Sequence, residues 1–267
     1  MRDACSAGVD EPLARAVVYR TLSMGFQAPE DGRLRQMGAR DGFPTVIAAL
    51  RHLQDRAGSG SIVPVITRLR SMPVEEVEAL ANRFARLFGH TARGLVCPCE
   101  TEYGPANAFY QPQQLADLSG YYLAFGLRPI AAAEVRVDHI ACECEFMDFL
   151  SRKEAWLLAS LAEPGRNPTA RGQDEETLEV TRQAARTFLR DHLGRFGRAF
   201  ASRLVSEDGD GYFGVLGRLL RAFVEVEAAR MGVEVGPIDL VVRPETIDDT
   251  PMACGTADEL IQIQRKP

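Results

Sequence analysis

The sequence predicts an all-α protein, and three observations support that prediction. Apolar residues recur at steps of three and four over most of the 267 residues, which is the period of a helix with one buried face. Glycine and proline interrupt this period at intervals that suit short connections between helices. Runs of alternating apolar and polar residues, typical of β-strands, are nearly absent before residue 233.

The expected helices follow one another along the chain. Glu11-Pro12 marks the entry to the first, because proline fits the first helical turn. Ser71-Met72-Pro73 followed by two glutamates predicts another helix start. A turn over 208–211 precedes the last long helix. Together the expected helices cover residues 12–26, 43–53, 62–69, 71–89, 112–125, 138–161, 175–193, 196–205 and 212–231.

The breaks between these helices suggest the domain organisation. A single helical domain is expected over 1–232, followed by an extended, mostly irregular tail over 233–267. The polar stretch 163–174, which holds two prolines and two glycines, predicts a flexible hinge. The stretch 90–112 loses the helical period but keeps aromatic residues, and a loop of this length inside a compact domain tends to be functional.

Composition excludes several classes of protein. The net charge of −6 argues against non-specific nucleic-acid binding, which depends on neutralising phosphates. No secretory signal and no membrane-spanning apolar run is evident, so a cytoplasmic protein without stable membrane insertion is expected. Six cysteines in a chain of this length indicate reduced thiols rather than a disulfide scaffold. Familiar catalytic motifs are absent, which favours a binding protein over an enzyme, with no cofactor expected.

The most informative segment runs from Asp138 to Met147. Asp138 fits a helix N-cap, since its carboxylate can accept the free amides of the first turn. One face of the helix that follows is expected in the core: Ile140, Cys144, Met147 and Leu150. A neighbouring stripe combines a histidine, an acid and an aromatic: His139, Glu143 and Phe146. This stripe suits the rim of a binding site; the alternative is a solvated face with a His–Glu pair.

Acidic and aromatic residues of the 90–112 loop are expected to gather near this helix start. Carboxylates in such a cluster hold a guanidinium through bidentate hydrogen bonds, and the aromatics contact an apolar peptide. The acids are Glu100, Glu102, Asp138, Glu143 and Asp117. The aromatics are Tyr103, Phe109, Tyr121, Tyr122 and Phe146. The alternative is a scatter of solvated acids.

The cysteines raise a second hypothesis, a metal or iron–sulfur site. Cys97-Pro98-Cys99 and Cys142-Glu143-Cys144 are the pairs concerned, with His139 as a further ligand. Residues two apart on a helix point about 200° apart, so Cys142 and Cys144 cannot both face one ion. Structural zinc sites also use two to four intervening residues rather than one. Buried thiols are therefore favoured over a site of Cys97, Cys99, His139 and Cys142.

Three stretches resemble the TorD/DmsD/NarJ family of redox-enzyme maturation chaperones. The first covers residues 15–29, with Tyr19, Phe26 and Pro29 in the pattern of an opening helix. The second joins Glu100-Thr101-Glu102-Tyr103-Gly104 to the helix of residues 115–126. The third is Asp138-His139-Ile140 followed by Glu143 and Glu145-Phe146-Met147. Order and spacing match over roughly residues 12 to 160.

The resemblance implies an all-α domain of about ten helices. It also implies a partner: the catalytic subunit of a molybdopterin oxidoreductase of the dimethyl-sulfoxide-reductase type, with its twin-arginine leader peptide. The chaperone would hold that subunit until its cofactor is inserted and so delay export, either as a monomer or as a domain-swapped dimer. The residues expected to bind client or leader are Glu100, Glu102, Tyr103, Tyr121, Asp138, His139, Glu143 and Phe146.

The chain departs from the family pattern at its cysteines. Cys144 stands where a leucine is common, and Cys97-Pro98-Cys99 precedes the Glu-Thr-Glu-Tyr motif. The metal-binding hypothesis thus stays open as an alternative, as does a helical enzyme acting on a small ligand such as a nucleotide in the same groove.

Overall fold

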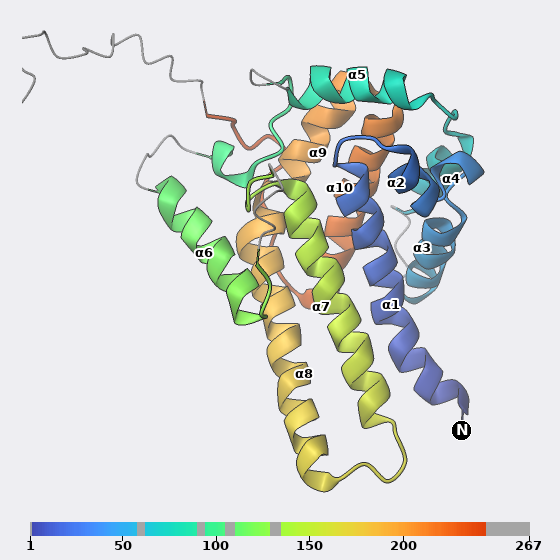
Figure 1. Cartoon of the computed structure of the whole chain (residues 1–267), viewed down its shortest axis with the longest axis vertical. Helices are drawn as coiled ribbons and strands as arrows, with labels where there is room; N and C mark the ends of the chain where they lie inside the picture. Colours follow the sequence, from blue (N-terminus) through green and yellow to red (C-terminus); the bar gives the residue numbers. More distant parts are fainter. Residues whose placement is uncertain (1, 58–61, 90–93, 105–109, 129–134, 244–267) are drawn as a thin grey trace, which may run out of the picture.

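A computed structural model describes residues 2–57, 62–89, 94–104, 110–128 and 135–243. Helices account for most of these residues, which confirms the all-α prediction (Figure 1). The α-helices are α1 (Arg2–Gly25), α2 (Asp31–Gln36), α3 (Pro44–Ala57), α4 (Ile62–Ser71), α5 (Val77–Phe88), α6 (Tyr110–Ala124), α7 (Ile140–Leu161), α8 (Pro168–Phe188), α9 (Gly194–Asp208) and α10 (Tyr212–Met231). Short 3₁₀ turns lie at η1 (Ala39–Asp41) and η2 (Glu100–Glu102), and a π-helical segment, η3 (Leu189–Leu193), joins α8 to α9.

The helices form two parts, a stalk of α1, α7 and α8 and a head of α2 to α5, α9 and α10. In Figure 1, α1, α7 and α8 run side by side through the lower half, and α7 packs against both of its neighbours. The helices α2 to α5, α9 and α10 gather in the upper half. A continuous apolar core joins the two parts and is rich in fully buried aromatic rings, among them Tyr19, Phe26, Phe200, Phe213 and Phe223. Isolated β-bridges between described residues pair Cys99 with His139 and Tyr103 with Val242.

Several predicted helix boundaries were wrong. α1 begins well before Pro12, which lies inside the helix. α5 begins at Val77 with Glu76 in the N-cap position, whereas Ser71 ends α4. The cap-and-proline pattern at residues 71–73 therefore marks the connection and not the helix start. The last helix was predicted correctly as Tyr212–Met231.

The connection between α7 and α8 is also shorter than the hinge predicted over 163–174. α8 begins at Pro168, because the side chain of Asn167 accepts a hydrogen bond from the Thr169 amide at 2.8 Å and proline fits the first turn. Arg166 and Ser160 both bind the Asp174 carboxylate, which ties the connection to the first turns of α8. Residues 162–167 are what remains of the hinge.

The described part of the tail lies against the head as an extended strap over residues 233–243. Its backbone pairs with the loop that contains η2: Gly104 N donates to Val241 O at 2.8 Å, and Arg243 N donates to Glu102 O at 2.8 Å. Arg198 and Arg203 of α9 donate to strap carbonyls. The predicted tail beyond Arg243 lies outside the described residues.

Candidate functional site

The start of α7 is built differently from the prediction at one residue. His139, not Asp138, occupies the N-cap position, and its Nδ1 accepts a hydrogen bond from the Ala141 amide at 3.1 Å. Burial lowers the pKa of His139 to about 4, which keeps the ring neutral and leaves Nδ1 able to accept. The predicted core face is confirmed, since Ile140, Cys144 and Met147 are all buried.

Asp138 instead fastens the loop that contains η2 to the start of α7. Its carboxylate is fully buried and accepts hydrogen bonds from the Thr101 amide at 3.1 Å and the Thr101 hydroxyl at 2.7 Å. The backbones are joined as well, because Glu100 N donates to Asp138 O and Ile140 N donates to Pro98 O, both at 2.8 Å. The N-cap prediction failed because the partners of Asp138 come from a segment about 37 residues earlier in the chain rather than from its own helix.

Arg136 covers the Asp138 carboxylate from the solvent side. Its Nε and Nη2 lie 3.0 and 2.9 Å from the two carboxylate oxygens, and Nη2 also donates to the Thr101 hydroxyl at 2.6 Å. Nη1 lies 3.4 Å from Glu102 Oε1. The Arg136 side chain is 45% exposed and that of Asp138 is 0% exposed. An arginine of this chain therefore occupies carboxylates that the sequence predicted for an arginine of the client.

Glu100 is held from the opposite side by the α8–α9 junction. Its carboxylate lies 3.0 Å from His192 Nδ1 and accepts from Arg195 Nε at 2.8 Å. His192 belongs to the π-helical segment η3, and such segments often lie at functional sites because they redirect one side chain of a long helix. The His192 Nε2 atom lies 3.2 Å from Asp117 on α6, so one imidazole joins three elements.

Glu143 lies in the first turn of α7 and is fully buried. Burial raises its pKa well above the usual range, and the neighbouring Glu100 and Asp138 raise it further. The neutral acid is thus the form that this position favours. The predicted convergence of acids is therefore real for Glu100, Asp138 and Glu143, but they meet inside the protein rather than on a solvated rim.

The predicted aromatic residues separate into two groups. Phe146 is buried and lies at the centre of one group, with its ring centroid 5.1 Å from Tyr122 and 4.8 Å from Phe188; Tyr121 contacts the same cluster. Tyr103 is fully buried elsewhere, against Phe196, and its hydroxyl donates to the Cys97 carbonyl. Phe109 lies outside the described residues.

The four cysteines of the two pairs are free thiols. Cys144 is part of the core, and Cys142 is half-buried, which raises its pKa to about 12. Cys97 and Cys99 lie in the loop before η2. Among the residues that the structure describes, no group of three or more histidine, cysteine or acidic side chains is arranged to hold a metal ion.

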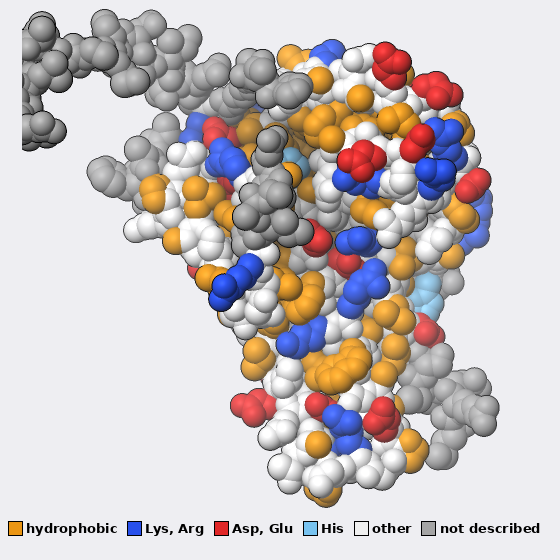
Figure 2. Space-filling model, in the orientation of Figure 1, with side chains coloured by type: hydrophobic (Ala, Val, Ile, Leu, Met, Phe, Trp, Pro, Cys, Tyr) orange, Lys and Arg blue, Asp and Glu red, His pale blue; other side chains and the backbone are white. Residues whose placement is uncertain are grey.

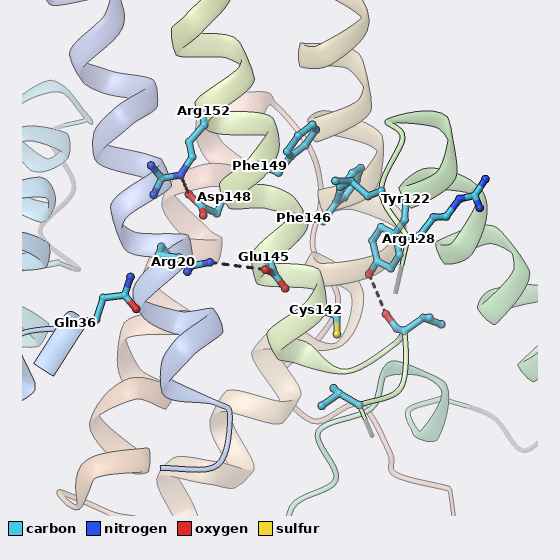
Figure 3. Close-up of a pocket in the computed structure, with 13 residues that line it drawn as sticks. Arg20, Gln36, Tyr122, Arg128, Cys142, Glu145, Phe146, Asp148, Phe149 and Arg152 are labelled. Carbon is cyan, nitrogen blue, oxygen red and sulfur yellow. Dashed lines mark hydrogen bonds and ion pairs between the residues drawn. The ribbon is translucent and has the colours of Figure 1, made fainter. Parts of the chain in front are cut away.

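A groove of about 660 Å³ runs beside α7, and we call it the α7 groove (Figure 3). Its walls come from α1, α2, the end of α6 and the segment before α7. The lining residues are Arg20, Gln36, Tyr122, Leu127, Arg128, Val135, Val137, Cys142, Glu145, Phe146, Asp148, Phe149 and Arg152. Three arginines, two acids and three aromatic rings are among them, so the groove offers both apolar contact and charge.

The α7 side of this groove follows a helical seam. Cys142, Glu145, Phe149 and Arg152 are spaced by three, four and three residues, the spacing with which one helix meets another. Trp156 continues the seam by four residues and is 61% exposed. Figure 2 shows apolar side chains interspersed with basic ones down the middle of this face.

Two ion pairs lie on the groove side of α7, one between α1 and α7 and one within α7. Arg20 of α1 lies 3.7 Å from Glu145, and Arg152 donates to Asp148 at 2.6 Å. The four residues of these ion pairs were not predicted from the sequence as site residues, whereas Tyr122 and Phe146 of the groove lining were among the aromatic residues expected to contact a peptide. The signal was present, because the three-four spacing of the α7 seam is visible in the sequence once the period is followed past Met147.

None of the helices in the described part of the chain is both long and apolar enough to cross a membrane.

No curated protein shows significant similarity to the chain. Residues 45–202 match the family model of the nitrate reductase delta subunit, a span that includes α3 to α8, the loop with η2 and the α7 side of the groove. The chain therefore belongs to the nitrate reductase delta subunit family of molybdoenzyme maturation chaperones.

Proposed function

We propose that this chain binds the leader segment of the catalytic subunit of a molybdopterin oxidoreductase in the α7 groove. It would hold that subunit in the cytoplasm while its cofactor is inserted, before export. The observation that carries the proposal is the groove itself. The half-buried Phe149 and the charged Glu145 and Arg152 are spaced along α7 for contact with another helix, and apolar lining comes from segments outside α7: Leu127, Val135 and Val137.

The eight residues predicted from the sequence take different roles in this proposal. Phe146 lines the groove directly. Tyr121 supports it through the aromatic cluster, and its hydroxyl binds Thr187 of α8 at 3.0 Å. The others do not line the groove and are buried or engaged with neighbouring elements: Glu100, Glu102, Tyr103, Asp138, His139 and Glu143.

The first test is co-purification of the client with the affinity-tagged chain. Phe149→Glu places a charge among the apolar side chains of the groove, and we expect it to reduce recovery of the molybdoenzyme catalytic subunit at least about tenfold. Val180→Glu is the matched control, since Val180 is 56% exposed on α8 and does not line the groove. Equal recovery with both variants would contradict the assignment of the site.

The second test concerns the leader. A synthetic peptide of the catalytic subunit's N-terminal 40 or so residues, long enough to carry an extended or helical leader, should bind the chain in calorimetry and lose affinity with Phe149→Glu. Recovery of the subunit without binding of this peptide would show that the chain recognises another part of its client.

A further inference from the structure

The short segment that forms one wall of the groove is the basis of this inference. Residues 135–138 connect the region after α6 to the start of α7, and Val135 and Val137 both line the groove. Tyr122, at the end of α6, donates its hydroxyl to the Val137 carbonyl at 2.9 Å (Figure 3). This wall has no helical hydrogen-bond ladder, so its position depends on hydrogen bonds with neighbouring elements, and the Tyr122 hydroxyl supplies one of them.

Arg136 supplies several further hydrogen bonds of this kind. It lies between the two groove-lining valines and binds Asp138, Thr101 and Glu102 with one planar guanidinium. A fork of this kind fixes direction as well as distance, which a lysine ammonium cannot do. The exposed part of Arg136 is nearly half of its side chain, so it is also accessible from solvent.

The loop to which Arg136 binds is itself fixed from two other sides. His192 and Arg195 hold Glu100, and the strap pairs with Glu102 and Gly104 through its backbone. Backbone hydrogen bonds join this loop to Asp138 and Ile140 at the start of α7, and Arg136 extends the connection to the part of the wall between the two groove-lining valines.

We infer that Arg136 is a positioning residue for the α7 groove: it sets the place of the Val135–Val137 wall and so determines how tightly the client segment is held. The inference rests on the proposed function, because it assigns a role at the same site. Asp138, prominent in the sequence, acts on the client through Arg136 and the wall.

The test compares two arginines in matched surroundings. Arg182 is 47% exposed and binds the buried Glu154 at 2.8 Å, much as Arg136 binds Asp138, but it does not line or border the groove. The probe is the N-terminal peptide of the catalytic subunit. Arg136→Gln should weaken its binding about tenfold, mainly through faster dissociation, and Arg182→Gln less than about twofold. Arg136→Lys should fall between wild type and Arg136→Gln.

A second readout separates positioning from general stability. Methylguanidinium at tens of millimolar should restore most of the affinity of Arg136→Ala, because it can refill the socket left between Asp138 and Thr101, and it should leave Arg182→Ala unchanged. The double variant Arg136→Gln/Asp138→Asn removes both charges, so no buried charge is left without a partner and the protein is expected to fold. It should bind the peptide as weakly as Arg136→Gln. Wild-type affinity of Arg136→Gln or of the double variant would overturn the inference.

The two proposals fail in different ways. If Phe149→Glu abolishes peptide binding and Arg136→Gln does not change it, the assignment of the α7 groove as the binding site is supported and the positioning role of Arg136 is contradicted. If neither variant changes peptide binding, the groove assignment falls and the role of Arg136 at that site falls with it.

Discussion

Two buried ion-pair networks of similar size connect to opposite parts of α7, and they differ in what they join. The interhelix network comprises Arg15, Glu154, Arg182, Glu227 and Arg230, all on regular helices. The loop network comprises Glu100, Arg136, Asp138, His192 and Arg195, and joins irregular backbone to helix ends. The first stabilises the packing of helices that already have a large apolar contact. The second fixes irregular segments, whose other contacts are separate backbone and side-chain hydrogen bonds rather than a helical ladder, and one of these segments is the groove wall.

The difference predicts that loss of the interhelix network affects stability and loss of the loop network affects binding. Replacing one partner of a buried ion pair is costly because it leaves the other charge without compensation. When the pair joins regular helices, which cannot shift separately, its loss lowers the free energy of unfolding of the whole protein. On an irregular segment the backbone can move instead.

The largest effect on stability is expected for Arg15→Ala. The Arg15 side chain is 3% exposed, lies 2.5 Å from Glu154 and 3.8 Å from Glu227, and both acids would keep only one other arginine. We expect a loss of about 3 kcal/mol in the free energy of unfolding, measured by urea titration. Arg182→Ala, at the exposed edge of the same network, should cost about 1 kcal/mol or less. Client-peptide affinity of the folded Arg15→Ala protein should match wild type; a tenfold loss there would erase the distinction between the networks.

Asp138→Asn comes next and should affect both quantities. The amide keeps the shape of the side chain but loses the charge that holds Arg136, and we expect a stability loss of about 2 kcal/mol together with weaker client-peptide binding. Urea titration and calorimetry on the same preparation give the two numbers. Destabilisation without any change in peptide binding would mean that Asp138, like the residues of the interhelix network, contributes to stability alone.

Two buried acids of α7 should respond to pH in opposite directions: Glu154 of the interhelix network, and Glu143 beside the loop network. Burial alone would raise the pKa of Glu154, but Arg15 and Arg182 hold it below its usual value, so its contribution to stability is present above the unfolded pKa of about 4.3 and is lost as the pH falls through the folded pKa. The pKa of Glu143 is raised, first by burial, so its contribution is complete below the unfolded pKa and is lost as the pH rises toward the folded pKa.

Glu143→Gln makes this second effect measurable. The amide imitates the neutral acid at every pH, so the variant should be more stable than wild type at pH 8 by about 1 kcal/mol and should differ less from it at pH 5. Unfolding free energies at the two pH values provide the comparison, with Glu154→Gln as the control whose effect should be nearly the same at both, because the lowered pKa of Glu154 keeps it ionised over this range. A Glu143→Gln protein that is less stable than wild type at pH 8 would mean that the ionised carboxylate is the native form.

The smallest effect is expected at the N-cap of α7. His139→Ala removes the side-chain acceptor for the Ala141 amide and should cost about 1 kcal/mol, whereas His139→Asn keeps an acceptor in the preferred position and should stay within a few tenths of a kcal/mol of wild type. Thermal unfolding of the three proteins is sufficient. Equal losses in both variants would show that the imidazole ring packs rather than caps.

The fold was largely predictable from the sequence because helical periodicity is a local signal. Tyr212–Met231 and the buried face of α7 follow from spacing and glycine positions alone. The site was predictable only in part. That Glu100, Asp138 and Glu143 meet could be proposed, but their burial could not, since Arg136 and Arg195 neutralise or cover them through contacts that no local pattern encodes. Arg15 and Glu154, 139 residues apart, likewise give no sequence signal of their pairing.

The exposed end of the α7 seam provides a natural optical reporter. Trp156 is the single tryptophan of the chain, so all indole fluorescence comes from one position, one helical turn beyond Arg152 of the groove. In the free protein its emission should be that of an indole largely in water. A client segment that extends along α7 past the groove would exclude water from the ring and shift the emission to shorter wavelength, whereas a segment confined to the groove would leave it unchanged. The spectrum of the complex therefore measures how far along α7 the client reaches, with no label attached to either partner.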